Sequence, residues 1–287
     1  MSQKKLTMSL SDSAQKFIFE KANIRGVIVH LTQSFQTLLK QHAYPLPVQK
    51  QMGEILLAAT LLFETLKLEG RMTIQFQSDG AIKMLVAQIN HEGQLRALAQ
   101  WDASATENEL EKGLGDGSLV ISIFKKNQKK PTQSIVSLQR KNIRDALAFY
   151  FLQSEQLPTI FAFAVKENRA SGMLLQAMPE HANPDRAETW KTMAAHVDKI
   201  DINELLYDNN VSFLQHYFPE EDIRLFDSRD LVFYCGCSIE KMESAIRTIG
   251  QEEANLILKE KSEIVVTCEY CNHQYGFDRS KVEAIFD

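Results

Sequence analysis

The sequence predicts an α+β protein with a large N-terminal domain of antiparallel sheet and helices, a helical linker, and a small C-terminal four-cysteine domain. Three observations predict this fold class. Strand patterns follow one another directly, helical patterns stand between the groups of strands, and every cysteine lies near the C-terminal end. A chain of 287 residues is long enough for one large domain and smaller ones.

The first domain is predicted to span residues 1–179. Alternating β-branched residues predict a strand at 24–31, and helical spacing of apolar residues predicts a helix at 48–68 that ends before Gly70. Turn pairs and further alternation predict the rest. These elements are a hairpin of 71–77 and 81–89, a strand pair of 119–124 and 134–138, a helix at 142–153, and a hairpin of 159–165 and 172–178.

Residues 180–231 are predicted to form a metastable helical linker. Between positions 180 and 230 the sequence has twelve acidic and five basic residues. Helical patterns occur at 187–200, 202–207 and 211–218, and helices this short are marginal without docking partners. The linker is therefore expected to depend on its neighbours for stability, although an ordinary helical subdomain fits the composition equally well.

The third unit is predicted to span residues 232–287. Helices are expected at 238–249, where Ser238 is a suitable N-cap, and at 251–258. The remaining predicted elements are a strand at 264–267 that leads into the second cysteine pair, a strand at 274–277 that leaves it, and a helix at 280–286.

Composition restricts the function classes. The net charge is −5 and the pI is about 5.9, which argues against a nucleic-acid binder that relies on general electrostatics. Neither a signal core nor a run of about 20 apolar residues is evident, so we expect a cytoplasmic protein with no membrane partner. In a reducing cytosol, paired cysteines indicate metal or redox sites rather than permanent disulfides.

The candidate site consists of two close cysteine pairs separated by thirty residues: Cys235 with Cys237, and Cys268 with Cys271. Four thiolates fill the tetrahedral coordination of one Zn²⁺ ion and leave no open position for substrate, which argues against an enzyme. His273 is a weaker candidate ligand, since four sulfurs already suffice. The same sulfurs are also two potential disulfides, so a structural zinc site and an oxidation sensor both remain open.

Energetic considerations favour a switch. A unit of about 55 residues buries little core, whereas structural zinc contributes about 10–16 kcal/mol in comparable peptides. Domain stability totals about 5–15 kcal/mol, so loss of the metal should unfold this unit. The marginal linker could unfold with it. Oxidation of both pairs would eject the zinc, and a Cys-x-Cys disulfide closes a small strained ring that is easily reduced.

Several motifs together resemble one known family. Besides the cysteine spacing, they include Ser154-Glu-Gln-Leu-Pro158, Gly172-Met-Leu-Leu-Gln176, Lys16-Phe-Ile-Phe-Glu20 and the Gly70–Gly80 region. The sequence resembles the 33 kDa chaperonin family of redox-regulated, zinc-binding cytosolic chaperones over essentially its whole length.

The resemblance implies a stress-response holdase that acts without ATP. Its reduced form would hold one Zn²⁺ at the four cysteines and be inactive. Oxidation would form Cys235–Cys237 and Cys268–Cys271 disulfides, release the zinc and unfold the linker. The protein would then bind unfolding clients, commonly as a homodimer, and later pass them to foldase chaperones. No motif marks the client-binding residues.

Two other function classes were weighed. A binding protein, for example for nucleic acid, would use the zinc as a permanent structural element, and the lysine-rich run 125–130 would suit it; the acidic total favours a solvated loop there. A thiol–disulfide oxidoreductase using Cys268 and Cys271 would need a thioredoxin-like βαβ context, which the sequence lacks. The glycine-rich 113–117 segment precedes a strand, which indicates a turn rather than a phosphate loop.

Overall fold

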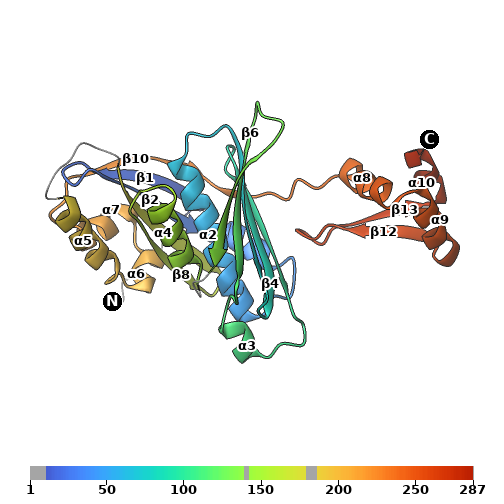
Figure 1. The fold of residues 1–287 in the computed structure, drawn as a ribbon, viewed down its shortest axis with the longest axis horizontal. Helices are drawn as coiled ribbons and strands as arrows, with labels where there is room; N and C mark the ends of the chain where they lie inside the picture. The colour runs from blue at the N-terminus through green and yellow to red at the C-terminus, as the bar shows by residue number, and fades with distance from the viewer. Residues whose placement is uncertain (1–10, 139–141, 179–185, 287) are drawn as a thin grey trace, which may run out of the picture. The chain divides into compact units, whose positions relative to one another are not determined.

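A computed structural model describes residues 11–138, 142–178 and 186–286. The chain forms two compact units that divide between Phe233 and Tyr234. The first unit contains two sheets, of five and six strands, and several helices, and the second is a small unit with its own two-stranded sheet (Figure 1). The predicted α+β class is confirmed.

One sheet of the first unit has five strands in the order β10-β1-β2-β9-β8, and all neighbours pair antiparallel. Strands β1 and β2 form one hairpin, and β8 and β9 form another. Strand β10 lies near the C-terminal end of the unit in sequence and pairs with β1. The strands are β1 Ser13–Phe19, β2 Ile24–Leu31, β8 Thr159–Lys166, β9 Arg169–Ala177 and β10 Ile223–Asp230.

The other sheet has six strands in the order β11-β5-β4-β3-β6-β7. Its neighbours are antiparallel except that the two-residue strand β11 runs parallel to β5. The predicted hairpins and strand pairs of residues 71–138 and 159–178 are confirmed. The strands are β3 Gly70–Ser78, β4 Ile82–Asn90, β5 Gln94–Trp101, β6 Gly117–Lys125, β7 Thr132–Leu138 and β11 Val232–Phe233.

Helix α2, Leu46–Thr65, forms the centre of the first unit. Residues on every side of this helix are buried, because it packs against strands of both sheets. The predicted helix at 48–68 is confirmed, although it ends at Thr65 rather than before Gly70. Shorter helices complete this unit: α1 Gln33–Leu39, α3 Glu107–Glu111 and α4 Ile143–Gln153. Within the described ranges, no helix is long and apolar enough to cross a membrane.

The five-stranded sheet is apolar on both faces. On β2, Val27 and Val29 point into the core around α2, whereas Ile24 and Ile28 point into a second apolar cluster on the opposite face. This split follows from the two-residue period of a strand.

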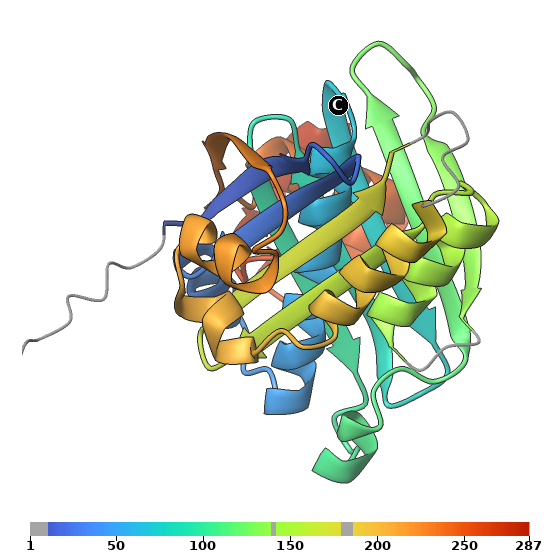
Figure 2. The same cartoon turned by 90° about the vertical axis from the view of Figure 1, so that its left-hand side faces the viewer.

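Three helices cover that second face: α5 Arg186–Val197, α6 Ile202–Tyr207 and α7 Asn210–Tyr217. Figure 2 shows them in gold and orange in front of the sheet, with α2 behind it. Their buried apolar residues, together with the residue that follows α7, complete the second cluster: Met193, Val197, Leu205, Leu206, Phe213, Leu214 and Phe218. The short helices predicted at these positions are confirmed, and they are docked on an apolar sheet face.

Strand β10 was not predicted; the sequence analysis expected only helices in this part of the chain. Its residues are mostly exposed or half-buried, so the segment lacks the apolar alternation that identifies buried strands. Its partner β1 determines its conformation, with a register shift between Gln15 and Phe17. Pairing with a distant strand is therefore what makes this segment extended.

A buried ion pair joins β10 to the central helix. The Arg229 guanidinium lies 2.6 Å from the Glu64 carboxylate at the end of α2, and Lys16 of β1 lies 3.1 Å from the other carboxylate oxygen. The Glu64 side chain is 3% exposed, whereas Arg229 is 30% exposed. Arg229 also donates to the carbonyl of Asn90. The last long strand before the second unit is thus fixed to the core of the first.

A buried histidine links the covering helices to the sheet. His30 of β2 is 3% exposed, its Nδ1 lies 2.9 Å from the Ser171 hydroxyl, and its Nε2 lies 2.8 Å from the Asn210 amide oxygen. The Asn210 amide nitrogen donates to Gln15, so its oxygen faces His30 and the imidazole donates from Nε2. This polar contact attaches the first residue of α7 to the sheet.

This histidine predicts a pH-dependent stability. Burial lowers the pKa of His30 below its ordinary value of 6.5; the Asn210 hydrogen bond opposes this effect and the charge of Arg169 adds to it. The unfolded chain therefore binds a proton more readily, so this contribution to stability is present above about pH 6.5 and is lost as pH falls towards the lowered folded pKa. We expect denaturant midpoints to fall between pH 7 and pH 5. This fall should be smaller in His30→Gln, and an equal fall in both proteins would contradict the assignment.

Candidate metal centre

The second unit is small. Its helices α8 Ile239–Ile249, α9 Gln251–Glu260 and α10 Arg279–Phe286 pack on a two-stranded sheet of β12 Glu263–Thr267 and β13 Gln274–Asp278. These elements agree with the predicted ones. The buried apolar core consists of Ile246, Ala254, Leu258, Ile264, Phe277, Val282 and Ile285. Seven such residues are few for an independent domain, so another source of stability is expected.

The first cysteine pair lies on the segment that leads into α8. Cys235 and Cys237 flank Gly236, whose φ of 66° lies in the left-handed region that glycine adopts without strain. The Lys241 amine donates to the carbonyl of Gly236. This turn brings both sulfurs to the same side of the chain.

The second cysteine pair lies in the turn between β12 and β13. The Cys268 N–H donates to the carbonyl of His273 at 2.9 Å, and the Asn272 N–H donates to the carbonyl of Cys268 at 2.8 Å. Asn272 has a φ of 58°, a conformation that asparagine tolerates better than most residues. The strand–turn–strand knuckle predicted around Cys268 and Cys271 is therefore present.

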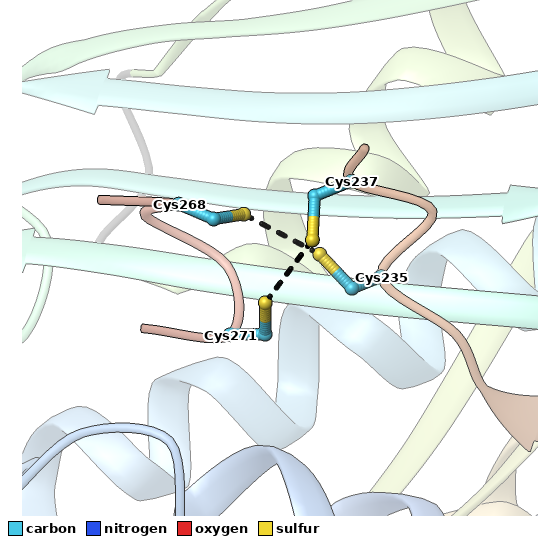
Figure 3. A group of neighbouring side chains, drawn as sticks. All are labelled: Cys235, Cys237, Cys268 and Cys271. Carbon is cyan, nitrogen blue, oxygen red and sulfur yellow. Dashed lines mark hydrogen bonds between the residues drawn. The ribbon is translucent and has the colours of Figure 1, made fainter. Parts of the chain in front are cut away.

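The four sulfurs form one cluster, as Figure 3 shows. All four Sγ atoms lie within 4.8 Å of one another. Cys235 Sγ is 3.4 Å from Cys268 Sγ, and Cys237 Sγ is 3.5 Å from Cys271 Sγ. The four cysteines are free thiols rather than disulfides, and Cys268 is the buried member. The structure thus brings together all four candidate residues.

This arrangement fits a tetrahedral metal ion. Zinc binds cysteine sulfur at about 2.3 Å, which separates the four ligand sulfurs by about 3.8 Å. The observed separations bracket that value. The donor set of four sulfurs is compatible with zinc, and it fills all four positions of a closed site.

The electrostatics of the four thiols also favour a bound cation. Burial raises the pKa of Cys235 far above its usual range and raises that of Cys271 as well. Burial acts on Cys237 in the same direction, but hydrogen bonds from Tyr275 and Cys271 lower its pKa below the ordinary value. The surroundings of Cys237 therefore favour its thiolate form, whereas those of Cys235 and Cys271 favour the neutral thiol. Four thiolates together require a bound cation to balance their charge.

Tyr275 of β13 contacts the sulfur cluster, whereas the sequence pattern predicted it only as part of a strand. Its hydroxyl donates to Cys237 Sγ at 3.1 Å, and this hydrogen bond, with a contribution from burial, raises the Tyr275 pKa to about 12. The exposed His273 ring packs edge-on against Tyr275 at 4.6 Å and is not part of the sulfur cluster. The sequence signal for this contact was the position of Tyr275, four residues after Cys271, the second cysteine of the turn.

Tyr275→Phe is expected to weaken zinc binding while leaving the fold intact. The substitution keeps the ring that packs against His273 and removes only the hydroxyl that donates to Cys237. Loss of such an outer hydrogen bond typically costs about 10–100-fold in metal affinity. Competition with a chromogenic chelator measures the change. An affinity equal to that of the unmodified protein would show that the hydroxyl does not support the site.

Two other sequence features have structural roles. The glycine-rich 113–117 segment is a connection between α3 and β6, as the sequence predicted, and it packs against the turn at Gly80. Glu155 accepts a hydrogen bond from the Tyr150 hydroxyl just after α4, which agrees with a role at a helix end. The lysine-rich segment is the exposed β6–β7 connection.

The fold and site together define a two-unit α+β protein with a closed four-cysteine metal-type centre. Comparison with known proteins identifies its family. The model of the Hsp33 protein family matches residues 12–278. The 33 kDa chaperonin of Nitrosococcus oceani is 38% identical over 279 residues, 97% of this chain and 96% of the relative. That of Shewanella sediminis is 37% identical over 277 residues, with 96% of each chain covered.

The chain therefore belongs to the Hsp33 family of molecular chaperones, which are not enzymes. A crystal structure of the 33 kDa chaperonin from Thermotoga maritima has the same fold, with a TM-score of 0.83 over 96% of this chain and 97% of that one. At 22% identity this likeness supports the fold alone. Unfolded client proteins are the partners expected for a chaperone of this family.

Proposed function

We propose that this chain is a redox-regulated, ATP-independent holdase that binds unfolding proteins during oxidative stress and prevents their aggregation. The observation that carries the proposal is the apolar face of the five-stranded sheet, which is covered only by the short helices α5–α7. A chaperone that must be inactive in one state needs such a removable cover. The four-cysteine unit, which follows later in the chain, supplies a redox-sensitive group.

Zinc is the proposed metal, bound by Cys235, Cys237, Cys268 and Cys271 in the reduced protein. Support comes from the sulfur separations and from the small core of the second unit, which needs added stability. When bound, the ion supplies charge balance and cross-linking rather than catalysis. We propose residues 232–287 as the redox-switch domain.

Oxidation removes these ligands. Each disulfide forms when two thiolates lose two electrons to one peroxide molecule, which takes up two protons and leaves as two water molecules. Disulfide sulfurs bind zinc poorly, so formation of two disulfides releases the ion. The family resemblance implies pairing within each motif, Cys235–Cys237 and Cys268–Cys271. Peptide mapping distinguishes this pairing from the cross-pairing Cys235–Cys268, whose sulfurs are 3.4 Å apart.

Residues 180–231 are proposed to act as the metastable linker. Helices of 12, 6 and 8 residues are marginal alone and depend on docking to the sheet. Unfolding of the second unit removes the folded neighbour that follows β11 in the chain. Release of α5–α7 would then expose residues such as Phe17 and Met173, giving an apolar surface that suits unfolding clients.

Several further features follow from this proposal. Exposed apolar surface favours association, so we propose a homodimer in the oxidised state. Reduction would restore the zinc site and transfer clients to foldase chaperones. A cytoplasmic location fits this redox chemistry, because cytosolic reductants keep the thiols reduced until stress occurs.

The test treats zinc-loaded, reduced protein with peroxide under mild heat. Zinc release, free thiols and suppression of aggregation of a thermally unfolding client protein are followed together. We expect four thiols to be lost, zinc to be released and aggregation to be suppressed in the same treatment. Zinc that stays bound, or zinc release without a gain in suppression, would instead support a binding protein with a permanent structural zinc.

A further inference from the structure

The strand β7 forms an open edge of the six-stranded sheet. It pairs with β6 on one side only, over Thr132 to Leu138. Among the described residues, no other backbone hydrogen bond involves this strand. The β6–β7 connection extends beyond the rest of the sheet in Figure 1. Half of the strand's backbone donors and acceptors therefore face outward.

The other sheet edges of the first unit have features that prevent strand addition. Strand β10 contains four charged residues and pairs with a register shift, and β11 has only two residues. Strand β8 packs against α4, α5 and α6. Natural edge strands usually have such charges, bulges or covers, because open edges recruit other chains. The seven residues of β7 contain no charge and no proline.

The centre of β7 also presents an apolar side chain to solvent. Ile135 is 74% exposed, whereas the next residue, Val136, is buried in the core. Neighbouring strands also carry polar side chains on the outer face of the sheet: Gln88 donates to Thr73, and Arg96 donates to Gln88. An extended chain added beside β7 would cover Ile135 in addition to pairing the backbone.

A cationic loop precedes this edge. The end of β6 and the β6–β7 connection together have four exposed lysines in six positions, although the whole chain has a net charge of −5. They are Lys125, Lys126, Lys129 and Lys130. An added strand that pairs with β7 and continues beyond Thr132, the first residue of β7, would lie next to this positive charge.

We propose that the β7 edge binds an extended apolar segment of an unfolded client as an added strand, with preference for segments flanked by acidic residues. Main-chain hydrogen bonds to β7 provide affinity without sequence specificity, as in other β-strand additions. Ile135 provides an apolar contact, and the lysine loop selects the flanking charge. This inference rests on the proposed holdase function and assigns part of its client surface.

A second copy of this chain fits the edge less well. Antiparallel pairing of two β7 strands aligns the segment before the strand in one copy with the segment after it in the other. Both segments are basic in sequence, with Lys129 and Lys130 before the strand and Arg140 and Lys141 after it. A pair of seven-residue strands is also small beside the roughly 1,200 Å² that a stable interface buries.

The test uses the full-length protein in its oxidised form, which is the active state in the proposed function, and two synthetic peptides with the same alternating valine–threonine centre. One peptide has aspartates at both ends and the other has lysines. We expect the acidic peptide to bind about tenfold more tightly, since cross-strand charge pairs contribute up to about 1 kcal/mol each. Amide hydrogen exchange should show new protection in residues 132–138. Protection only elsewhere in the chain would overturn the proposal.

Matched variants distinguish peptide binding at the β7 edge from nonspecific binding to other exposed apolar residues. Ile135→Lys adds a charge to the open edge and should weaken binding of the acidic peptide about tenfold. Leu46→Lys is the control, because Leu46 is 70% exposed but lies at the start of α2. Equal effects of the two substitutions would overturn the proposal. Replacing Lys129 and Lys130 by glutamate should reverse the preference between the two peptides.

Competing occupants give different results. If Ile135→Lys changes the sedimentation of the protein but not peptide binding, the edge is an interface between copies and the proposal is wrong. A single-stranded oligonucleotide is tested as a competitor of the acidic peptide for the lysines. If it competes and the peptide gives no protection in β7, the lysine loop is a nucleic-acid surface and the proposal is wrong. Ile135→Lys should still release zinc on oxidation, so failure of the edge proposal is distinguishable from failure of the redox switch.

Discussion

Cys268→Ser is expected to unfold residues 234–286 and to leave the first unit folded. Cys268 is the buried cysteine of the cluster, and its sulfur lies 3.4 Å from that of Cys235. Loss of an outer hydrogen bond costs about 10–100-fold in metal affinity, so loss of a ligand should cost more than about a hundredfold. In the proposed zinc-bound form, metal binding worth about 10–16 kcal/mol would be the main stabilisation of a unit with seven core residues.

Heteronuclear NMR spectra with and without zinc measure this effect. The Cys268→Ser protein should lose dispersed signals from the second unit and retain those of α2. Val265→Ser is a suitable control, since Val265 lies on β12, which leads into Cys268, and is 49% exposed. A folded second unit with stoichiometric zinc in Cys268→Ser would show that another ligand, such as His273, completes the site.

Arg229→Ala is expected to destabilise the first unit by about 3 kcal/mol. The substitution leaves the Glu64 carboxylate, which is 3% exposed, with Lys16 as its remaining ion-pair partner. Removing one member of a buried pair costs about 3–5 kcal/mol, and the partial exposure of Arg229 favours the lower end. The free energy of unfolding from urea titration of the zinc-loaded protein measures this change.

The same strand provides the control for this prediction. Arg224 of β10 pairs with Glu20 at 3.0 Å, but the two side chains are 57% and 42% exposed. Exposed pairs contribute about 0–1 kcal/mol, so Arg224→Ala should have little effect. Similar losses of unfolding free energy for the two substitutions would mean that the burial of Glu64 does not make its ion pair with Arg229 more stabilising than an exposed pair.

Local patterns in the sequence were sufficient to predict the four-cysteine cluster. The spacing of Cys235 and Cys237, and of Cys268 and Cys271, identified all four members of the cluster. The flanking strands were also predicted, because the knuckle is formed by residues close in sequence. Tyr275 was missed as a functional residue, since only the folded turn brings its hydroxyl to Cys237.

Contacts between distant segments could not be predicted. Strand β10 has weak alternation and is extended because β1 pairs with it from more than 190 positions away. The contact between His30 and Asn210 joins residues 180 positions apart, and neither residue type indicates it. The same holds for Glu64 and Arg229. Tertiary pairing, rather than local propensity, determines these features.

The proposed function gives the four-cysteine unit and the helices α5–α7 related roles. The second unit has a small apolar core, and α5–α7 bury an apolar face of the five-stranded sheet. Helices this short depend on docking for their stability. In the proposed function, loss of zinc converts the folded second unit into an unfolded segment, and α5–α7 are then released from the sheet. Stability and sensing then depend on the same four sulfurs.

Amide hydrogen exchange of the reduced, zinc-loaded protein and the fully oxidised protein tests this account most directly. We expect oxidation to remove protection from residues 234–286 and from α5–α7 at residues 186–217, while α2 keeps its protection. If zinc leaves and residues 234–286 unfold but α5–α7 remain protected, the apolar sheet face stays covered. That result would contradict the proposed switch.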